Sequence, residues 1–220
     1  SVASKQASGV ETITTNDTSF AALKTDGSVV TWGSSSYGGD SSSVTSELSS
    51  NVKAVYSNDG AFAAVKTDGS VVSWGHSSHG ADSTYSILGG NTSVASELSS
   101  NVETIFSNWW AFAAVKTDGS VVTWGLWKYG ADSSSVASEL SSGVQSIASG
   151  WHTFAALKTD GSVVTWGASA EGGDSSAVAS ELSSGVQSIT STAKAFAALK
   201  TDGSSPVSSS TCLTLTLYTT

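Results

Sequence analysis

The sequence predicts an all-β protein: a β-propeller, or an open propeller-like arc, of five roughly 42-residue, three-stranded antiparallel units. Three observations lead to this fold class. The chain repeats itself five times, each repeat holds three short segments with strand character, and both faces of the central hairpin are apolar. A small sheet with two apolar faces must be covered on both sides, and stacked sheets cover one another.

The repeats align on five phenylalanines, Phe20, Phe62, Phe112, Phe154 and Phe196. An insertion, STYSILGGNT, lengthens the second repeat. We expect a single repeat domain over residues 1–220, with units at approximately 1–42, 43–92, 93–134, 135–176 and 177–220. The last unit is degenerate, because FAALKTDGS is followed by SPVSSSTCLTLTLYTT, in which Leu213, Leu215 and Leu217 alternate like a strand. A closed ring, an open arc and a fragment of a longer array all agree with this pattern.

Each element of the unit follows from its local sequence. A short apolar segment, Val10 to Ile13 in the first unit, predicts the first strand. FAALKT and SVVTWG flank Asp-Gly, the dipeptide typical of a tight hairpin with positive φ angles, and predict the second and third strands. The connector SVASELSS is too short and too rich in serine for a stable helix, although it has room for one helical turn.

Pairing across Asp26-Gly27 predicts which residues share a face of the first hairpin. One face would carry Ala21, Leu23, Val30 and Trp32, and the other Phe20, Ala22, Val29 and Thr31. Because Trp32, Trp74, Trp124 and Trp166 recur in every complete unit, we expect these four tryptophans in the core.

The run GVQSIASGWHTFAALKTDGSVVTWGASAEGG, from Gly143 to Gly173, resembles the repeat of the regulator-of-chromosome-condensation family. The shared features are a V-x-x-I strand, a small-Gly-x-His stretch, the Asp-Gly hairpin and a terminal Trp-Gly. The unit length is closer still to the shortened repeat of bacterial β-lactamase-inhibitor propellers. The resemblance implies blades that radiate from a central axis. It implies little about function, since propellers of this family bind very different partners.

Composition excludes several classes of function. The chain has no arginine, nine scattered lysines and a formal net charge of −9, so we expect no nucleic-acid partner and no attraction to anionic membranes. No apolar run is long enough for direct membrane insertion. The single Cys212 excludes an intrachain disulfide and a cysteine zinc cluster. Sequons at Asn16 and Asn91 lean toward a secreted or organelle-lumenal location, and such regular units also resemble those of algal proteins, which suggests a plastid complex.

Variation among the five copies locates a candidate binding surface. In a meander the Asp-Gly turns share one end, here called the bottom, and the loops before Phe and after Trp-Gly share the opposite end, the top. The bottom turn is Thr-Asp-Gly-Ser in every copy, whereas the top loops differ each time. A constant framework with adjacent variable loops is typical of binding surfaces. The candidate partner-binding residues are Trp109, Trp110, Trp127, Lys128, Tyr129, Trp151 and His152.

The sequence therefore predicts a non-catalytic protein-binding propeller, a peripheral or accessory subunit or a scaffold of a larger assembly. The alternative is a carbohydrate-binding, lectin-like propeller, because exposed Trp and Tyr also stack on sugar rings. A third hypothesis is a metal-dependent enzyme at His76, His79 and Asp82. Asp82 has counterparts in units without histidines, Asp40, Asp132 and Asp174, which favours a turn cap over a metal ligand or a calcium site. We expect no cofactor, since no phosphate-binding glycine loop or nucleophile elbow is present.

Overall fold

The computed structural model describes residues 8–81, 93–205 and 207–208 of the 220-residue chain. Asp82, Asn91 and Leu213 to Leu217, which entered the sequence predictions, lie outside these ranges. The described residues form strands and single turns of 3-10 helix, and no α-helix. The strands are β1 (Val10–Thr15), β2 (Ser19–Lys24), β3 (Val29–Gly33), β4 (Val52–Ser57), β5 (Ala61–Lys66), β6 (Val71–Gly75), β7 (Val102–Ser107), β8 (Ala111–Lys116), β9 (Val121–Gly125), β10 (Val144–Ser149), β11 (Thr153–Lys158), β12 (Val163–Gly167), β13 (Val186–Ser191), β14 (Phe196–Lys200) and β15 (Val207–Ser208).

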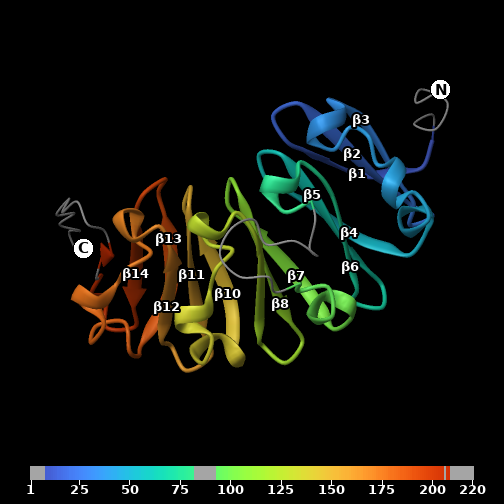
Figure 1. The fold of residues 1–220 in the computed structure, drawn as a ribbon. Helices are drawn as coiled ribbons and strands as arrows, with labels where there is room; N and C mark the ends of the chain where they lie inside the picture. Colours follow the sequence, from blue (N-terminus) through green and yellow to red (C-terminus); the bar gives the residue numbers. More distant parts are fainter. Residues whose placement is uncertain (1–7, 82–92, 206, 209–220) are drawn as a thin grey trace.

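The strands form five separate three-stranded antiparallel sheets, each made of consecutive strands. We call the sheets with their loops blades 1 to 5 in chain order. Figure 1 shows them side by side along an open arc, with blade 1 and blade 5 at opposite ends. The first strands of neighbouring blades contact one another, from β1 through β4, β7 and β10 to β13, and so line the inside of the arc. The predicted all-β, propeller-like architecture of three-stranded units is confirmed, in its open form.

The bottom turn differs from the predicted two-residue hairpin. Phe20 pairs with Trp32 and Leu23 with Val29, and the Lys24 amide donates to the Ser28 carbonyl, so the loop holds three residues. Only Gly27 has a positive φ, 76°, as in a type I turn followed by a glycine bulge. The extra residue shifts the pairing by one, and a shift of one residue exchanges faces. The predicted face assignment was therefore wrong: Phe20, Ala22, Val30 and Trp32 share one face, and Ala21, Leu23, Val29 and Thr31 the other.

The apolar residues form a separate core between each pair of neighbouring blades. Between blades 2 and 3, Ala63 and Val65 of β5 pack against Ile105, Phe112 and Trp124 of the next blade. The same arrangement recurs between blades 1 and 2 and between blades 3 and 4, and a smaller version joins blades 4 and 5. Each inner blade thus buries its Ala-x-Leu/Val face on the following blade and its Phe/Trp face on the preceding one. This is the two-sided coverage that the apolar hairpin requires.

Single turns of 3-10 helix lie between the blades: η1 (Ser35–Tyr37), η2 (Ser42–Val44), η3 (Glu47–Ser49), η4 (Ser77–His79), η5 (Glu97–Ser99), η6 (Trp127–Tyr129), η7 (Ser134–Val136), η8 (Glu139–Ser141), η9 (Ser169–Glu171) and η10 (Ser176–Val178). The connector that had room for one helical turn holds η2 and η3 after blade 1, and η1, η4, η6 and η9 follow the third strands. Leu48, Leu98 and Leu140 are the buried residues of η3, η5 and η8. Asp40, Asp132 and Asp174 each accept the backbone amide two residues on, which confirms the turn-cap interpretation for these three.

Candidate binding surface at the top of the arc

The two loops at the top of each blade are joined by hydrogen bonds, as the meander predicts. In blades 1 to 3 an asparagine before the second strand donates its side-chain amide to the carbonyl of an aromatic residue after the third strand. The pairs are Asn16 to Tyr37 at 2.8 Å, Asn58 to His79 at 2.6 Å and Asn108 to Tyr129 at 2.6 Å. The sequence analysis missed this role, although the asparagine recurs in three copies.

Rings from four blades form a continuous series of contacts across the top, which we call the aromatic ladder. It consists of Tyr37, His76, His79, Trp110, Tyr129, His152, Trp109 and Trp151. The contacts cross each blade boundary: His79 stacks on Trp110 at 4.2 Å between ring centroids, and Tyr129 stacks on His152 at 4.1 Å. The loop after the third strand of one blade thereby meets the loop before the second strand of the next.

The last step of the ladder is the most exposed. Trp109 and Trp151 stack with centroids 4.6 Å apart, and 45% and 38% of their surfaces remain exposed. Backbone bonds hold both loops in place, from the Trp109 amide to the Trp151 carbonyl and from the Trp151 amide to the Ala193 carbonyl. Large exposed rings on a fixed backbone can contact a partner at little conformational cost.

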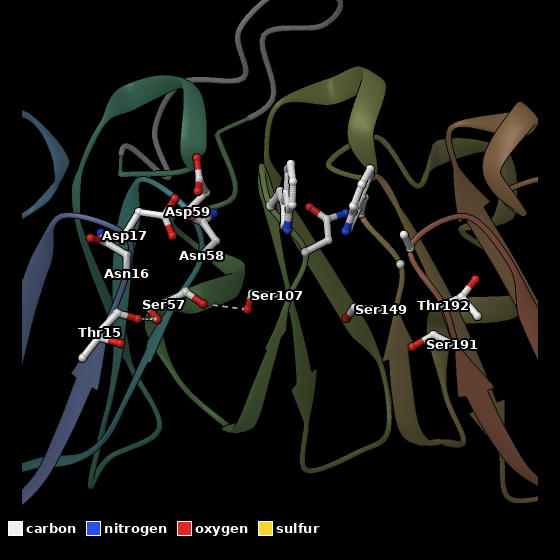
Figure 2. Close-up of a pocket in the computed structure, with 15 residues that line it drawn as sticks. Thr15, Asn16, Asp17, Ser57, Asn58, Asp59, Ser107, Ser149, Ser191 and Thr192 are labelled. Carbon is white, nitrogen blue, oxygen red and sulfur yellow. Dashed lines mark hydrogen bonds between the residues drawn. The ribbon is translucent and has the colours of Figure 1, made fainter.

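This tryptophan pair borders a cavity of about 590 Å³ on the inside of the arc, which we call the axial pocket (Figure 2). The pocket lies where the first strands of all five blades end. Its lining is Thr15, Asn16, Asp17, Ser57, Asn58, Asp59, Ser107, Asn108, Trp109, Ser149, Gly150, Trp151, Ser191, Thr192 and Ala193. Apart from the two tryptophans, a glycine and an alanine, the lining is polar, and its charged members are Asp17 and Asp59. Burial, together with the nearby Asp17 carboxylate, raises the pKa of Asp59.

The predicted partner-binding residues fall into two groups. Five of them, Trp109, Trp110, Tyr129, Trp151 and His152, belong to the aromatic ladder. Trp127 and Lys128 lie apart: Lys128 Nζ sits 5.3 Å from the Trp127 ring, and both border a different depression between the outer loops of blades 3 and 4. The seven residues do not form one contiguous surface. Within η6, Trp127 borders the outer depression and Tyr129 belongs to the aromatic ladder.

Two charged residues extend the ladder toward blade 5. His152 Nδ1 lies 2.7 Å from Glu171 Oε2, and Lys194 Nζ lies 3.5 Å from Glu171 Oε1. The same Lys194 Nζ is 5.8 Å from the centroid of Trp151. Neither Glu171 nor Lys194 was singled out by the sequence analysis, because the choice of binding residues rested on aromatic side chains in the variable loops.

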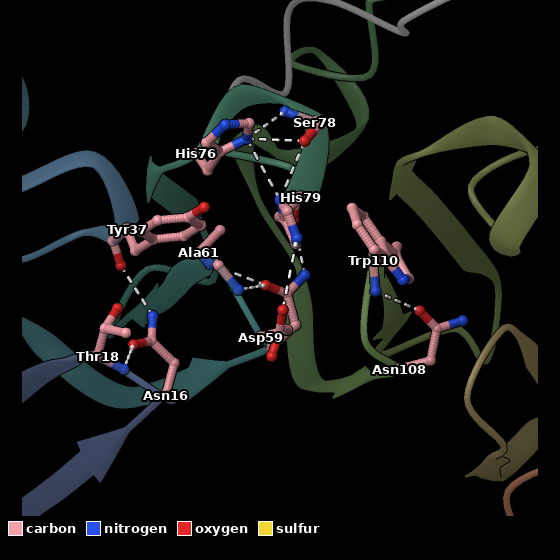
Figure 3. A network of polar contacts seen from close by, with 12 residues as sticks. Asn16, Thr18, Tyr37, Asp59, Ala61, His76, Ser78, His79, Asn108 and Trp110 are labelled. Carbon is pink, nitrogen blue, oxygen red and sulfur yellow. Dashed lines mark hydrogen bonds and ion pairs between the residues drawn. The ribbon is translucent and has the colours of Figure 1, made fainter. Parts of the chain in front are cut away.

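The histidines considered as metal ligands form a polar cluster in blade 2 (Figure 3). His76 Nδ1 and His79 Nδ1 are 3.3 Å apart, and the Ser78 hydroxyl lies within hydrogen-bond distance of both. His79 is buried, and its Nε2, 3.8 Å from Asp59 Oδ2, has no hydrogen-bond partner. Burial, with a smaller contribution from His76, lowers the pKa of His79 to about 4, so its ring is neutral at pH 7. Within the described ranges, no three His, Cys, Asp or Glu side chains converge as metal ligands.

Comparison with known proteins identifies the repeat. Residues 144–172, which include β10, β11 and β12, match the family described as the regulator of chromosome condensation (RCC1) repeat. Blade 4 is therefore similar to an RCC1 repeat. No curated protein matches the chain. In the described part of the chain, no helix has the length and apolar character needed to cross a bilayer.

Solved structures support the same architecture. Human WBSCR16 is 20% identical over 90% of this chain and 61% of its own, with a TM-score of 0.56. A chain in the crystal structure of Kap60 bound to yeast RCC1 (Prp20) is 18% identical over 90% of this chain and 55% of that one, with a TM-score of 0.53. Prp20p from Saccharomyces cerevisiae gives 17% identity, coverage of 90% and 56%, and a TM-score of 0.50. The chain therefore has the fold of RCC1-type propellers and spans less than two thirds of their length.

Proposed function

We propose that this chain is a non-catalytic binding protein that holds a segment of another protein in the axial pocket, against the paired rings of Trp109 and Trp151. One observation carries the proposal: two stacked, exposed tryptophans, fixed by backbone hydrogen bonds, border a polar cavity at the top of the arc. Such a protein would serve as an accessory subunit or scaffold of a larger assembly. Structural neighbours support a protein partner. Yeast RCC1 (Prp20) is bound to Kap60 in one crystal structure, and the Prp20p structure is described together with the binding of Prp20p to Gsp1p and histones.

The chemistry of the pocket favours a partner segment that presents lysine or arginine. Asp17 and Asp59 supply negative charge at the pocket, the whole chain carries −9, and the tryptophan faces accept cations. Lys194 Nζ lies 5.8 Å from the centroid of Trp151, a distance at which an ammonium group interacts with the ring face, and this supports the proposal. We therefore expect basic side chains of the partner at the carboxylates of blades 1 and 2 and at the rings of blades 3 and 4.

The test compares two pairs of substitutions in quantitative affinity purification, followed by affinity measurement with the purified partner. Replacing exposed hot-spot tryptophans typically costs about 2 kcal/mol or more, about 30-fold in affinity. We expect Trp109→Ala/Trp151→Ala to weaken binding by at least this factor and Asp17→Asn/Asp59→Asn to weaken it less. The matched control, Trp127→Ala, removes a top-loop tryptophan outside the pocket and should leave affinity within about twofold. Equal binding by all variants would contradict the assignment of the surface.

The same rings and carboxylates also match a carbohydrate site, because aromatic faces stack on sugar rings and carboxylates accept hydrogen bonds from sugar hydroxyl groups. This second candidate makes a different prediction for the same variants. A glycan array would show binding that Trp109→Ala/Trp151→Ala abolishes, whereas the protein-binding proposal predicts an array without signal.

A further inference from the structure

The interfaces between blades follow one rule. The Ala-x-Leu/Val face of each blade packs on the Phe/Trp face of the blade that follows, as with Leu23 of blade 1 against Phe62 and Trp74 of blade 2. Blades 2 to 5 all receive a preceding blade in this way, and blades 1 to 4 all cover a following one. Among the described blades, two half-interfaces are left over: the Phe/Trp face of blade 1 and the Ala-x-Leu face of blade 5.

The leftover face of blade 1 has the residues of an internal interface but exposes them. Val10, Ile13 and Phe20 are 39%, 56% and 40% exposed, whereas their counterparts in blade 3, Val102, Ile105 and Phe112, are between 0% and 3%. These three make up half of the six exposed large hydrophobic residues of the described chain. A contiguous exposed apolar face of this kind marks an interaction site.

The leftover face of blade 5 is the matching half. Leu199 is 42% exposed, whereas its counterparts Leu23, Val65 and Val115 are buried in interface cores. It belongs to the same group of exposed hydrophobic residues, so four of those six lie on the two end faces.

A backbone hydrogen bond that recurs between neighbouring blades has its donor and its acceptor on opposite end blades as well. At all four boundaries a valine amide that opens one blade donates to the glycine carbonyl in the bottom turn of the blade before it, at 2.9 Å: Val52 to Gly27, Val102 to Gly69, Val144 to Gly119 and Val186 to Gly161. Among the described residues, the Gly203 carbonyl of blade 5 and the Val10 amide of blade 1 are without this bond. A Cβ built on Gly203 meets nothing within 4 Å, whereas at the four inner glycines it comes within 2.9 Å or less of the next blade's backbone.

We propose that the blade 5 face of one copy of this chain docks on the blade 1 face of a second copy, head to tail, and reproduces the internal blade interface between molecules. The occupant follows from complementarity, because the chain itself carries both halves of an interface that it forms four times internally. Such a contact is heterologous. Every assembly of docked copies therefore keeps one free blade 1 face and one free blade 5 face, to which further copies can bind. Ser205 of blade 5 stands where blade 1 has Val29, so this half-interface is less apolar than the internal ones and the contact between copies is weaker.

The experiment uses the full chain and two single substitutions at exposed positions, Ile13→Lys on blade 1 and Leu199→Lys on blade 5. Thr117→Lys, in the exposed bottom turn of blade 3, is the matched control because it introduces the same side chain away from both faces. Circular dichroism establishes that each variant is folded, and sedimentation velocity at high micromolar concentration measures association. Wild type and Thr117→Lys should form dimers and longer oligomers, and each face variant alone should be monomeric.

Mixing the two face variants gives the decisive result. Ile13→Lys keeps an intact blade 5 face and Leu199→Lys keeps an intact blade 1 face, so the mixture should form dimers with one copy of each and nothing larger. A folded wild type that stays monomeric would overturn the proposal. So would a mixture without dimers, or a single face variant that still self-associates, since that result indicates an isologous contact.

Discussion

Blade 1 and blade 3 have nearly the same framework sequence and very different burial. Phe112 is fully buried, whereas Phe20, at the same position of the repeat, is 40% exposed, and Trp124 is buried whereas Trp32 is only partly so. Nothing within the blade accounts for the difference. It comes from the preceding blade, which exists for blade 3 and is absent for blade 1 in the described chain. In this fold a core residue is defined by its neighbour as much as by its own type, and matched substitutions in the two blades can test that statement.

The largest effect is expected from truncating the two phenylalanines. Phe112→Ala should destabilise the chain by about 3–5 kcal/mol, since it leaves a cavity in a packed interface. Phe20→Ala should cost about 1 kcal/mol or less, because water already reaches the ring. Urea unfolding measures both. Equal losses would show that the blade 1 face is covered.

The buried His79 should make stability depend on acidity. Its pKa of about 4 in the folded chain lies below the ordinary 6.5, so its contribution to stability is complete above pH 6.5 and is lost as the pH falls toward 4. The loss is at most about 3 kcal/mol. His79→Gln should flatten the stability profile between pH 6.5 and 4, and an unchanged slope in that variant would contradict the assignment. Asp59, whose pKa is raised by burial, faces His79 and acts in the opposite direction near the lower end of this window.

Two bottom-turn glycines give a matched pair with a smaller effect. Both have positive φ, 75° at Gly119 and 83° at Gly203, so alanine should cost about 1 kcal/mol of backbone strain at either site. At Gly119 the new Cβ would also lie 2.6 Å from the Gly143 nitrogen, whereas at Gly203 it would meet nothing. Gly119→Ala should therefore be the more destabilising of the two in thermal unfolding, and the reverse order would contradict the blade contact.

An effect of similar size to that of the glycine pair is expected at the recurring tryptophans. Trp166 Nε1 donates to the Gly130 carbonyl of the preceding blade at 3.0 Å, so Trp166→Phe should cost about 1–3 kcal/mol by leaving that carbonyl unpaired. Trp32→Phe should cost about 0.5 kcal/mol or less, because blade 1 has no preceding blade in the described chain to provide an acceptor. Equal losses in chemical unfolding would remove the distinction between inner and terminal tryptophans.

The sequence was sufficient to predict the architecture, because the same pattern of strands and turns occurs in five copies of the repeat. Strand positions, the top and bottom ends and the turn-capping aspartates could be predicted from FAALKTDGSVVTWG and its flanks. The hairpin register could not, since Asp-Gly fits both a two-residue loop and the three-residue loop observed at Gly27. One residue of difference was enough to assign Trp32 to the wrong face.

The candidate site could be predicted only in part. The variable tryptophans were evident, but their grouping depends on which neighbouring loops meet, as His79 meets Trp110 across a blade boundary. The exposure of the blade 1 face could not be predicted either, because Ile13 and Ile105 have equivalent sequence surroundings. Only the arrangement of the blades in space distinguishes them.

Amide hydrogen exchange at the valines that open each blade tests most directly whether neighbouring blades, rather than residue type, define the core. It is best measured on the Leu199→Lys variant, in which a second copy cannot cover blade 1. The account predicts slow exchange at Val52, Val102, Val144 and Val186, whose amides donate to the preceding blade, and fast exchange at Val10. Protection of Val10 equal to that of Val102 would contradict it.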